Sequence, residues 1–229
     1  PENVAALIID PIAGEGGFIV PAPGFLATLS QFCTDNGIVF IADEVQTGFC
    51  RTGTTFACDQ EGIVPDLVTM AKGMAGGMPL AAVTGRAEMM DSVHPGGLGG
   101  TYAGNQETCA AAIGALTELA AGHLNGRARE IEAIFFDRLA PLADKYPQIG
   151  EIRGRGAMIA IELVDPATGH PDPELTANLA KYAHSQAVVM LTAGTYGNVI
   201  RFLPPLVISD ELLNEGLDVL SDALAECLD

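Results

Sequence analysis

An uninterrupted apolar run that ends at two adjacent acids is the feature that most constrains how this chain of 229 residues can fold. The run covers residues 37–42, and Asp43 and Glu44 follow it directly. Apolar residues at consecutive positions indicate a strand covered on both faces, as in a parallel sheet. Ligands of open parallel sheets gather beyond the carboxyl ends of the strands. Asp43 is therefore predicted to stand where a ligand would bind.

A second short apolar run, at residues 67–71, leads to Lys72 and then to a glycine-rich turn. The other two lysines, Lys145 and Lys181, lie in polar helical contexts. Burial at a strand end would favour the neutral amine of Lys72, which is a nucleophile and a base. Such an amine can form a Schiff base with a carbonyl cofactor, and a carboxylate such as that of Asp43 can hold a pyridine nitrogen protonated.

Three separated motifs carry a family resemblance. They are DPIAGEGGF at residues 10–18, IADEVQTGFCRTG at residues 41–53, and GGLGGTYAGN at residues 96–105. The second motif, followed by Pro65-Asp66-Leu67 and Ala71-Lys72, resembles the signature of class III (omega) aminotransferases, which depend on pyridoxal 5′-phosphate. The other two are similar to bacterial 4-aminobutyrate aminotransferases in particular.

The resemblance implies an α/β protein with the fold type I of pyridoxal-phosphate-dependent transferases. Residues 1–125 would form part of the large cofactor-binding domain, with a mainly parallel sheet, and residues 126–229 a smaller C-terminal α+β domain. The glycines at 122 and 126 mark the boundary. The family's Gly-Ser phosphate loop and the aromatic residue that stacks on the cofactor have no counterpart here. The chain is therefore expected to be the C-terminal half or more of such an enzyme.

The residue pattern predicts strands that alternate with helices in the first part and a mixed arrangement in the second. Strands are expected at residues 4–9, 37–42, 67–71, 80–84, 187–192 and 198–203, with an exposed antiparallel strand at 150–163. Helices are expected at residues 23–36, 105–121, 127–146, 173–186 and 209–228.

For the cofactor, the resemblance implies five residues. Lys72 would hold pyridoxal 5′-phosphate covalently and then carry a proton, and Asp43 would pair with the ring nitrogen. Val45 would pack on the ring face, and Gln46 would approach the phenolic oxygen. Thr101 would bind the cofactor phosphate of the neighbouring subunit, which implies a homodimer or a larger assembly.

Glu15 and Arg201 are implied to form the specificity pair. Arg201 lies on an otherwise apolar strand, and a guanidinium there requires an anionic partner, which a carboxylate matches geometrically. By the resemblance, Arg201 holds the α-carboxylate of glutamate or 2-oxoglutarate, and Glu15 neutralises it when the substrate lacks that group. The implied reaction moves the amino group of 4-aminobutyrate to 2-oxoglutarate. A structural salt bridge is the alternative role for this pair.

Other donors and other reactions stay open. Asp10 stands where many 4-aminobutyrate enzymes have glutamate, and Ala13 stands where they often have glutamine. Aminotransferases of 5-aminovalerate, ornithine-type donors or 2,4-diaminobutyrate are therefore alternatives. An aminomutase or racemase of the same fold would keep Lys72 and Asp43 but perform no net transfer.

Composition argues against several classes of function. The net charge of −18 disfavours nucleic-acid binding, which needs clustered basic residues. No apolar stretch approaches the ~20 residues that cross a bilayer, so a membrane span is not expected. The five cysteines contain no Cys-x-x-Cys pair, which favours reduced thiols and a cytoplasmic location. The histidines lack the spacing of metal ligands.

Overall fold

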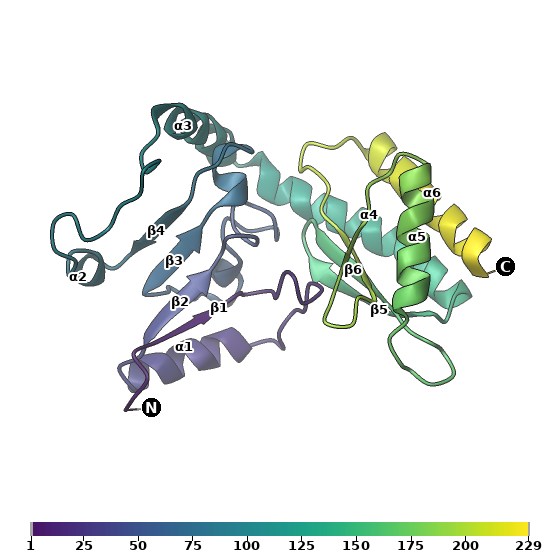
Figure 1. The fold of residues 1–229 in the computed structure, drawn as a ribbon, viewed down its shortest axis with the longest axis horizontal. Helices are drawn as coiled ribbons and strands as arrows, with labels where there is room; N and C mark the ends of the chain where they lie inside the picture. The colour runs from purple at the N-terminus through teal and green to yellow at the C-terminus, as the bar shows by residue number, and fades with distance from the viewer. Residues whose placement is uncertain (1, 229) are drawn as a thin grey trace. The chain divides into compact units, whose positions relative to one another are not determined.

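The computed structural model describes residues 2–228 and separates the chain into two compact units (Figure 1). Unit 1 comprises the residues up to Ile12 together with Pro21–His123. Unit 2 comprises Ala13–Val20 together with the residues from Leu124 onward. The division lies next to the boundary expected at residue 125. No pattern in the sequence indicated that Ala13–Val20 belongs with the second unit.

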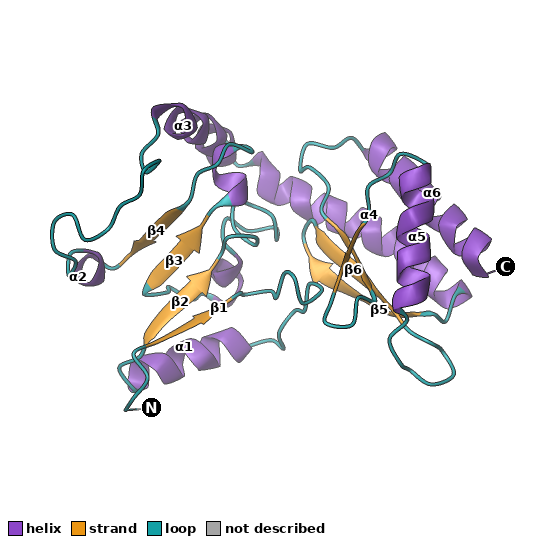
Figure 2. Cartoon of the chain, in the orientation of Figure 1, coloured by secondary structure: helices purple, strands orange, loops and turns teal. Residues whose placement is uncertain are grey.

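Unit 1 is built on a four-stranded sheet in the order β1-β2-β3-β4 (Figure 2). Parallel pairing joins β1 to β2 and β2 to β3, whereas β4 is antiparallel to β3. The mainly parallel sheet predicted from the sequence is thus confirmed. The strands are β1 (Ala6–Ile9), β2 (Val39–Asp43), β3 (Leu67–Met70) and β4 (Ala82–Gly85).

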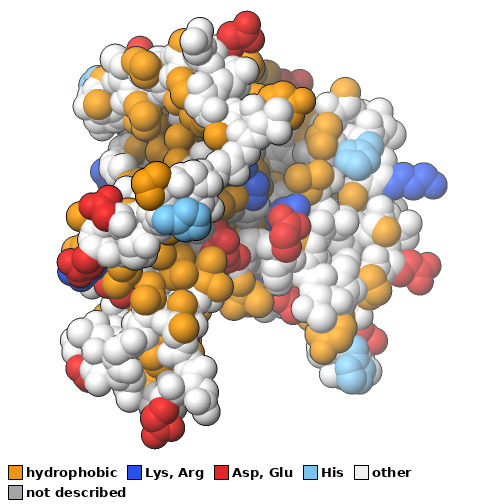
Figure 3. Space-filling view, turned by 60° about the vertical axis from the view of Figure 1, so that its left-hand side comes forward, with side chains coloured by type: hydrophobic (Ala, Val, Ile, Leu, Met, Phe, Trp, Pro, Cys, Tyr) orange, Lys and Arg blue, Asp and Glu red, His pale blue; other side chains and the backbone are white. Residues whose placement is uncertain are grey.

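Helix α1 (Phe25–Asp35) packs against one face of this sheet. Its side chains form a core with Phe40 and Ala42 of β2, and burial alternates along that strand. On other strand positions the side chains of Ile8 and Val83 are 58% and 52% exposed. Figure 3 shows in orange that hydrophobic side chains are exposed in clusters on the surface of the protein. The expectation that β2 is covered on both faces is therefore wrong for residues 2–228, because α1 packs on one face only.

Helix α3 (Gln106–Ala120) supports the turn that follows β3. The Asn105 side chain caps it by accepting hydrogen bonds from the backbone of Glu107 and Thr108. The helix packs against η2 (Lys72–Ala75), a 3-10 turn that begins with the lysine singled out in the sequence. Unit 1 also contains η1 (Ala57–Glu61) and α2 (Ala87–Met90).

Unit 2 contains an antiparallel sheet in the order β5-β6-β8-β7. Its core joins side chains of three helices to Ile159 and Ile161 of β6 and Ile200 of β8. The helices are α4 (His123–Lys145), α5 (Pro173–Ser185) and α6 (Asp210–Leu228). The strands are β5 (Ile149–Arg155), β6 (Met158–Leu163), β7 (Leu191–Ala193) and β8 (Val199–Phe202).

Two sequence predictions are wrong in this unit. Residues 150–163 are not one exposed strand, because Gly156 adopts a φ of 59° and turns the chain into a hairpin of β5 and β6. The second strand of that hairpin is buried along nearly its whole length. Helix α4 begins at His123 and runs through Gly126, where an interruption was expected. None of the helices that the structure describes within residues 2–228 is long and apolar enough to cross a membrane.

Candidate active site

The carboxyl ends of β2 and β3 bring Asp43 and Lys72 to one edge of the unit 1 sheet. Asp43 is the last residue of β2 and pairs with Thr69 of β3. Lys72 follows the end of β3 at Met70 by two positions. Parallel neighbours end at the same edge, so the carboxylate and the amine stand on adjacent strand ends. This is the edge where the sequence predicts a ligand.

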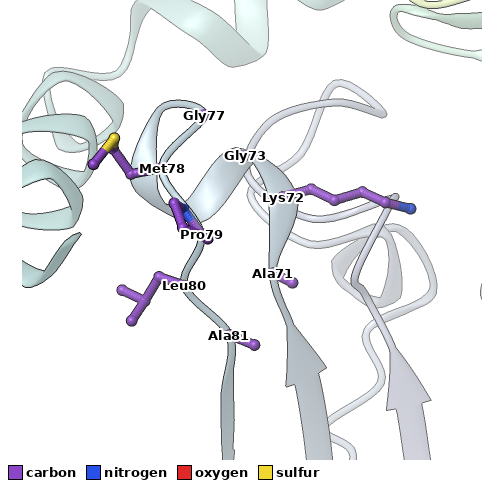
Figure 4. Close-up of a pocket in the computed structure, with 8 residues that line it drawn as sticks. All are labelled: Ala71, Lys72, Gly73, Gly77, Met78, Pro79, Leu80 and Ala81. Atoms are coloured by element: carbon purple, nitrogen blue, oxygen red, sulfur yellow. The ribbon is translucent and has the colours of Figure 1, made fainter. Parts of the chain in front are cut away.

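Lys72 is exposed, which corrects the expectation that it is buried at the end of a buried strand. The residues of β3 are themselves only partly buried, so they cannot enclose the side chain that follows. The backbone of Lys72 has a φ of 49°, a left-handed conformation that is costly for a residue with a β-carbon. A pocket of about 660 Å³ lies beside this turn. Figure 4 shows the lysine side chain extending away from Met78, Pro79 and Leu80 of that pocket.

Polar atoms without a partner lie at and just after the same strand ends. Asp43 is held in place because its Oδ1 accepts a hydrogen bond of 3.1 Å from the backbone N–H of Val45. The Oε1 atom of Gln46 and the Oγ1 atom of Thr69 are both buried and have no hydrogen-bond partner among the described residues. Buried polar atoms are nearly always hydrogen-bonded, so this pair of atoms indicates a place for a polar ligand. Thr69 carried no signal in the sequence beyond its position on a predicted strand.

Glu44, next to Asp43, is fully buried and organises the loop that follows β2. One carboxylate oxygen accepts hydrogen bonds from the Thr47 hydroxyl and from the backbone of Ala57, and the other from the backbone of Cys58 at 2.9 Å. Burial, and then the charge of Glu44, raise the pKa of the Cys58 thiol, which keeps it neutral beside the carboxylate. The sequence identified Glu44 only as the second of two acids, because its partners lie up to 14 positions away.

We expect Glu44→Gln to lower the free energy of unfolding of the full-length protein by about 2–3 kcal/mol. Glutamine has one acceptor oxygen, so its amide N–H₂ would face a backbone N–H and leave that donor unsatisfied. Denaturant unfolding of the variant measures the loss. Glu88→Gln, at an exposed position of α2, is the matched control and should unfold like the wild type. Equal stability of the two variants would contradict the structural role of Glu44.

Thr101 lies in a segment, residues 91–104, that is exposed along its whole length. The segment ends where Asn105 caps α3. Tyr102, the next residue, is 85% exposed, and Leu98 is 70% exposed. Large apolar side chains at this exposure leave the segment free to contact another molecule. The family resemblance implied that Thr101 binds a phosphate in a neighbouring subunit, and that role stays a prediction.

Glu15 and Arg201 form an ion pair in unit 2. This is the pairing that the family resemblance implied. The Nη1 atom of Arg201 and the Oε1 atom of Glu15 are 2.8 Å apart. The Arg201 side chain is only 12% exposed, whereas that of Glu15 is 77% exposed. The Nε atom of Arg201 is buried and has no acceptor among the described residues. Arg201 also lines a pocket of about 600 Å³ whose other walls are mostly apolar.

In this geometry a ligand carboxylate can displace Glu15 from Arg201. A guanidinium binds a carboxylate best through two parallel hydrogen bonds, and Nε is one of the donors that can take part. The exposed Glu15 carboxylate gains little from its pairing, because water solvates it well. A ligand carboxylate could therefore replace Glu15 and also use the free Nε donor.

A model of the family described as aminotransferase class-III matches residues 1–224. The 4-aminobutyrate aminotransferase of Mycobacterium leprae is 59% identical over 225 residues, which are 98% of this chain and 50% of that protein. The chain thus spans about half the length of the curated relatives it matches.

Solved structures of aminotransferases share the fold. The ornithine aminotransferase from Toxoplasma gondii has a TM-score of 0.89 at 38% identity, and the match covers 98% of this chain and 52% of that one. An amine transaminase from an uncultivated Pseudomonas species, solved in its PLP-bound form, has a TM-score of 0.89 at 35% identity. That match covers 97% of this chain and 52% of the other. The predicted fold class is therefore confirmed.

Proposed function

Because the chain belongs to the class-III aminotransferases, we propose that it serves the transfer of the terminal amino group of 4-aminobutyrate to 2-oxoglutarate. The observation that carries this proposal is the ion pair between Glu15 and Arg201. The amino donor 4-aminobutyrate lacks an α-carboxylate, whereas the acceptor 2-oxoglutarate has one. An enzyme that binds both in turn needs a cation that is neutralised with the first and available to the second. A largely buried arginine paired with an exposed carboxylate provides such a cation.

The residues at the strand ends of unit 1 fit pyridoxal 5′-phosphate. Asp43 supplies an anion for the ring nitrogen, Lys72 supplies a primary amine, and Gln46 and Thr69 supply buried polar atoms that lack partners among the described residues. When bound, the cofactor supplies an electron-withdrawing ring that stabilises negative charge on the substrate carbon bearing the amino group. Val45, partly buried after β2, offers an apolar surface for the ring face.

The protein side chains then divide the proton chemistry between them. The Nζ atom of Lys72, once free, would accept the proton from the substrate carbon and release it again as a general base and acid. The Asp43 carboxylate would keep the ring nitrogen protonated by its negative charge. Its orientation is fixed by the backbone N–H of Val45.

Arg201 and Glu15 would select the substrate. With 4-aminobutyrate bound, Glu15 would stay on Arg201 and neutralise it. With glutamate or 2-oxoglutarate bound, the α-carboxylate would take the place of Glu15 and bind the guanidinium through two parallel hydrogen bonds, for which Nε and Nη2 lie on one side. The two half-reactions would thus use Arg201 in alternation.

We further propose a homodimer in the cytoplasm, in which Thr101 serves the cofactor phosphate of the neighbouring subunit. The support is the exposure of the whole segment that carries Thr101. Backbone N–H groups of its glycines and the threonine hydroxyl are donors suited to a phosphate.

The test is incubation of the full-length protein with 4-aminobutyrate, 2-oxoglutarate and pyridoxal phosphate. Glutamate and succinate semialdehyde should form in equal amounts. An aminomutase or racemase would make no glutamate, and that result would reject the proposal. Replacing 4-aminobutyrate with 5-aminovalerate, ornithine or 2,4-diaminobutyrate ranks the alternative donors by kcat/KM.

We expect Arg201→Lys to lower kcat/KM for glutamate by about 10- to 100-fold, because lysine cannot form the paired hydrogen bonds to a carboxylate. The half-reaction with 4-aminobutyrate should change by less than about threefold, because an ammonium can still pair with Glu15. Single-turnover rates with each amine measure the two effects. A parallel loss with both amines would show that Arg201 does not discriminate between them.

A further inference from the structure

We propose that Arg153 is a positioning residue that holds the backbone of Ala13–Val20, hereafter the Glu15 loop, so that the Glu15 carboxylate meets Arg201 whenever no substrate carboxylate does. This inference rests on the proposed function. The sequence placed Arg153 on an exposed strand, yet its side chain is only 9% exposed. That burial is the first sign that it has a specific role.

Arg153 and Arg201 lie in one row across the unit 2 sheet. Arg153 of β5 pairs with Ala160 of β6, and Ala160 pairs with Arg201 of β8. Paired residues of neighbouring strands point to the same face, so both guanidinium groups project from the same side. Two strand spacings separate them, about 10 Å. The small, fully buried Ala160 between them leaves space for a loop to lie across the row.

The Glu15 loop lies across this row and contacts both arginines. Its Gly17 carbonyl accepts a hydrogen bond of 2.8 Å from the Nε atom of Arg153. Gly17 has a φ of +104°, and a β-carbon there would lie 3.1 Å from Nη2 of Arg153, so a side chain at this position would crowd the contact. Two residues earlier, the Glu15 carboxylate reaches Arg201. One arginine thus holds the backbone of the loop, and the other holds its side chain.

Further contacts fix the same backbone. The Glu15 carbonyl accepts a hydrogen bond of 3.1 Å from the backbone N–H of Gly194. The ends of the loop are joined by two hydrogen bonds between Ala13 and Ile19. The Phe18 side chain is fully buried, with its ring centroid 5.9 Å from the Cζ atom of Arg201. The Glu15 side chain itself is 77% exposed, so it can swing without moving the loop.

The two arginines differ in how their charge is balanced. Arg153 donates to two carboxylates, those of Glu151 and Glu162, so its charge is already neutralised and an incoming anion would gain little from it. Arg201 is paired with the exposed Glu15 and keeps a free Nε donor. Arg153 is therefore suited to anchor the loop, whereas Arg201 is suited to exchange its partner.

If Arg153 holds the loop, its loss should impair the reaction with 4-aminobutyrate but not the binding of a dicarboxylate. A loosened loop would place Glu15 on Arg201 less often and leave an uncompensated charge when 4-aminobutyrate binds. A dicarboxylate would instead bind more readily, because it would displace a weaker competitor from Arg201. This difference follows from linked equilibria. An interaction that stabilises the ion pair between Glu15 and Arg201 weakens the binding of a dicarboxylate, because the dicarboxylate must break that pair.

The experiment compares Arg153→Met and Arg153→Lys in the full-length holoenzyme. Lysine keeps the positive charge, but its single ammonium cannot contact the Gly17 carbonyl and both carboxylates together, so this variant guards against a substitution that merely misfolds the protein. For both variants we expect kcat/KM with 4-aminobutyrate to fall by about tenfold and that with glutamate to change by less than about threefold. The dissociation constant of glutarate, measured by calorimetry, should stay equal or decrease.

Arg138→Met is the control, because Arg138 also ties two elements of unit 2 together, through Asn214 and Asp218, and belongs to no proposed site. Its kinetic and binding constants should match those of the wild type. Equal losses with both amines in the Arg153 variants, or weaker glutarate binding, would overturn the proposal. If the wild type itself transfers no amino group, the proposed function fails, while glutarate binding to the wild type and the variants still decides the role of Arg153.

Discussion

Replacing Lys72 with alanine in the full-length enzyme should lower the rate of amino transfer by about 10⁴-fold or more, because both the covalent attachment of the cofactor and the proton carrier would be lost. Lys72 stands at the sheet edge next to the strand end that carries Asp43. Its left-handed backbone conformation is a local cost that the fold tolerates at this position. The variant should fold normally, because the exposed lysine side chain contributes little to packing.

Two measurements check this prediction. The first is the single-turnover rate with 4-aminobutyrate. The second is reduction of the holoenzyme with borohydride, followed by peptide mapping, which should place the label on the peptide containing Lys72 and on no peptide of the alanine variant. Lys181→Ala, at an exposed position of α5, is the control and should keep both the rate and the label. Label on Lys145 or Lys181 would reject the assignment.

Asp43→Asn should lower the single-turnover rate by about 10²- to 10³-fold, the second largest effect we expect. Asparagine keeps the shape of the side chain and can still accept the hydrogen bond from Val45. It removes the negative charge, so the ring nitrogen of the cofactor would lose its proton and the ring would withdraw electrons less strongly. The affinity for pyridoxal phosphate, measured after dialysis, should fall as well.

Asp66→Asn is the matched control in the same sheet. The Asp66 carboxylate accepts hydrogen bonds from the backbone of Phe40 and from Arg86, and it has no assigned part in the chemistry. This variant should lose stability but keep the single-turnover rate within about threefold. A rate in Asp43→Asn as high as in Asp66→Asn would remove Asp43 from the proposed mechanism.

Local pattern was sufficient to predict most elements of the fold. Helix α3 follows from residue propensities within a few positions, as does the strand that ends at Asp43. The hairpin of β5 and β6 did not follow, because alternation continues on both sides of Gly156. Burial of β6 depends on helices that precede and follow it in the sequence, and periodicity carries no information about those contacts.

The residues of the candidate site also fall into those that the sequence analysis identified and those that it did not. Asp43, Lys72 and Arg201 were singled out because each follows or interrupts an apolar run with a charge, whereas Glu15 as the partner of Arg201 was implied by the family resemblance. Arg153 was not predicted, because it sits among other charged residues and contacts Gly17 from 136 positions away. Such a role becomes visible only when the sheet places the two segments together.

The assignment of Ala13–Val20 to unit 2 has a consequence for exchanging parts between homologous enzymes. A chimera joined at a single crossover near residue 124 would inherit Arg153 and Arg201 from one parent. It would inherit the Glu15 loop, which contacts both arginines, from the other parent. A donor specificity could be transplanted only as two pieces of sequence. Among homologous enzymes that differ in their amino donor, residues of Ala13–Val20 should therefore co-vary with residues of unit 2 beyond Leu124.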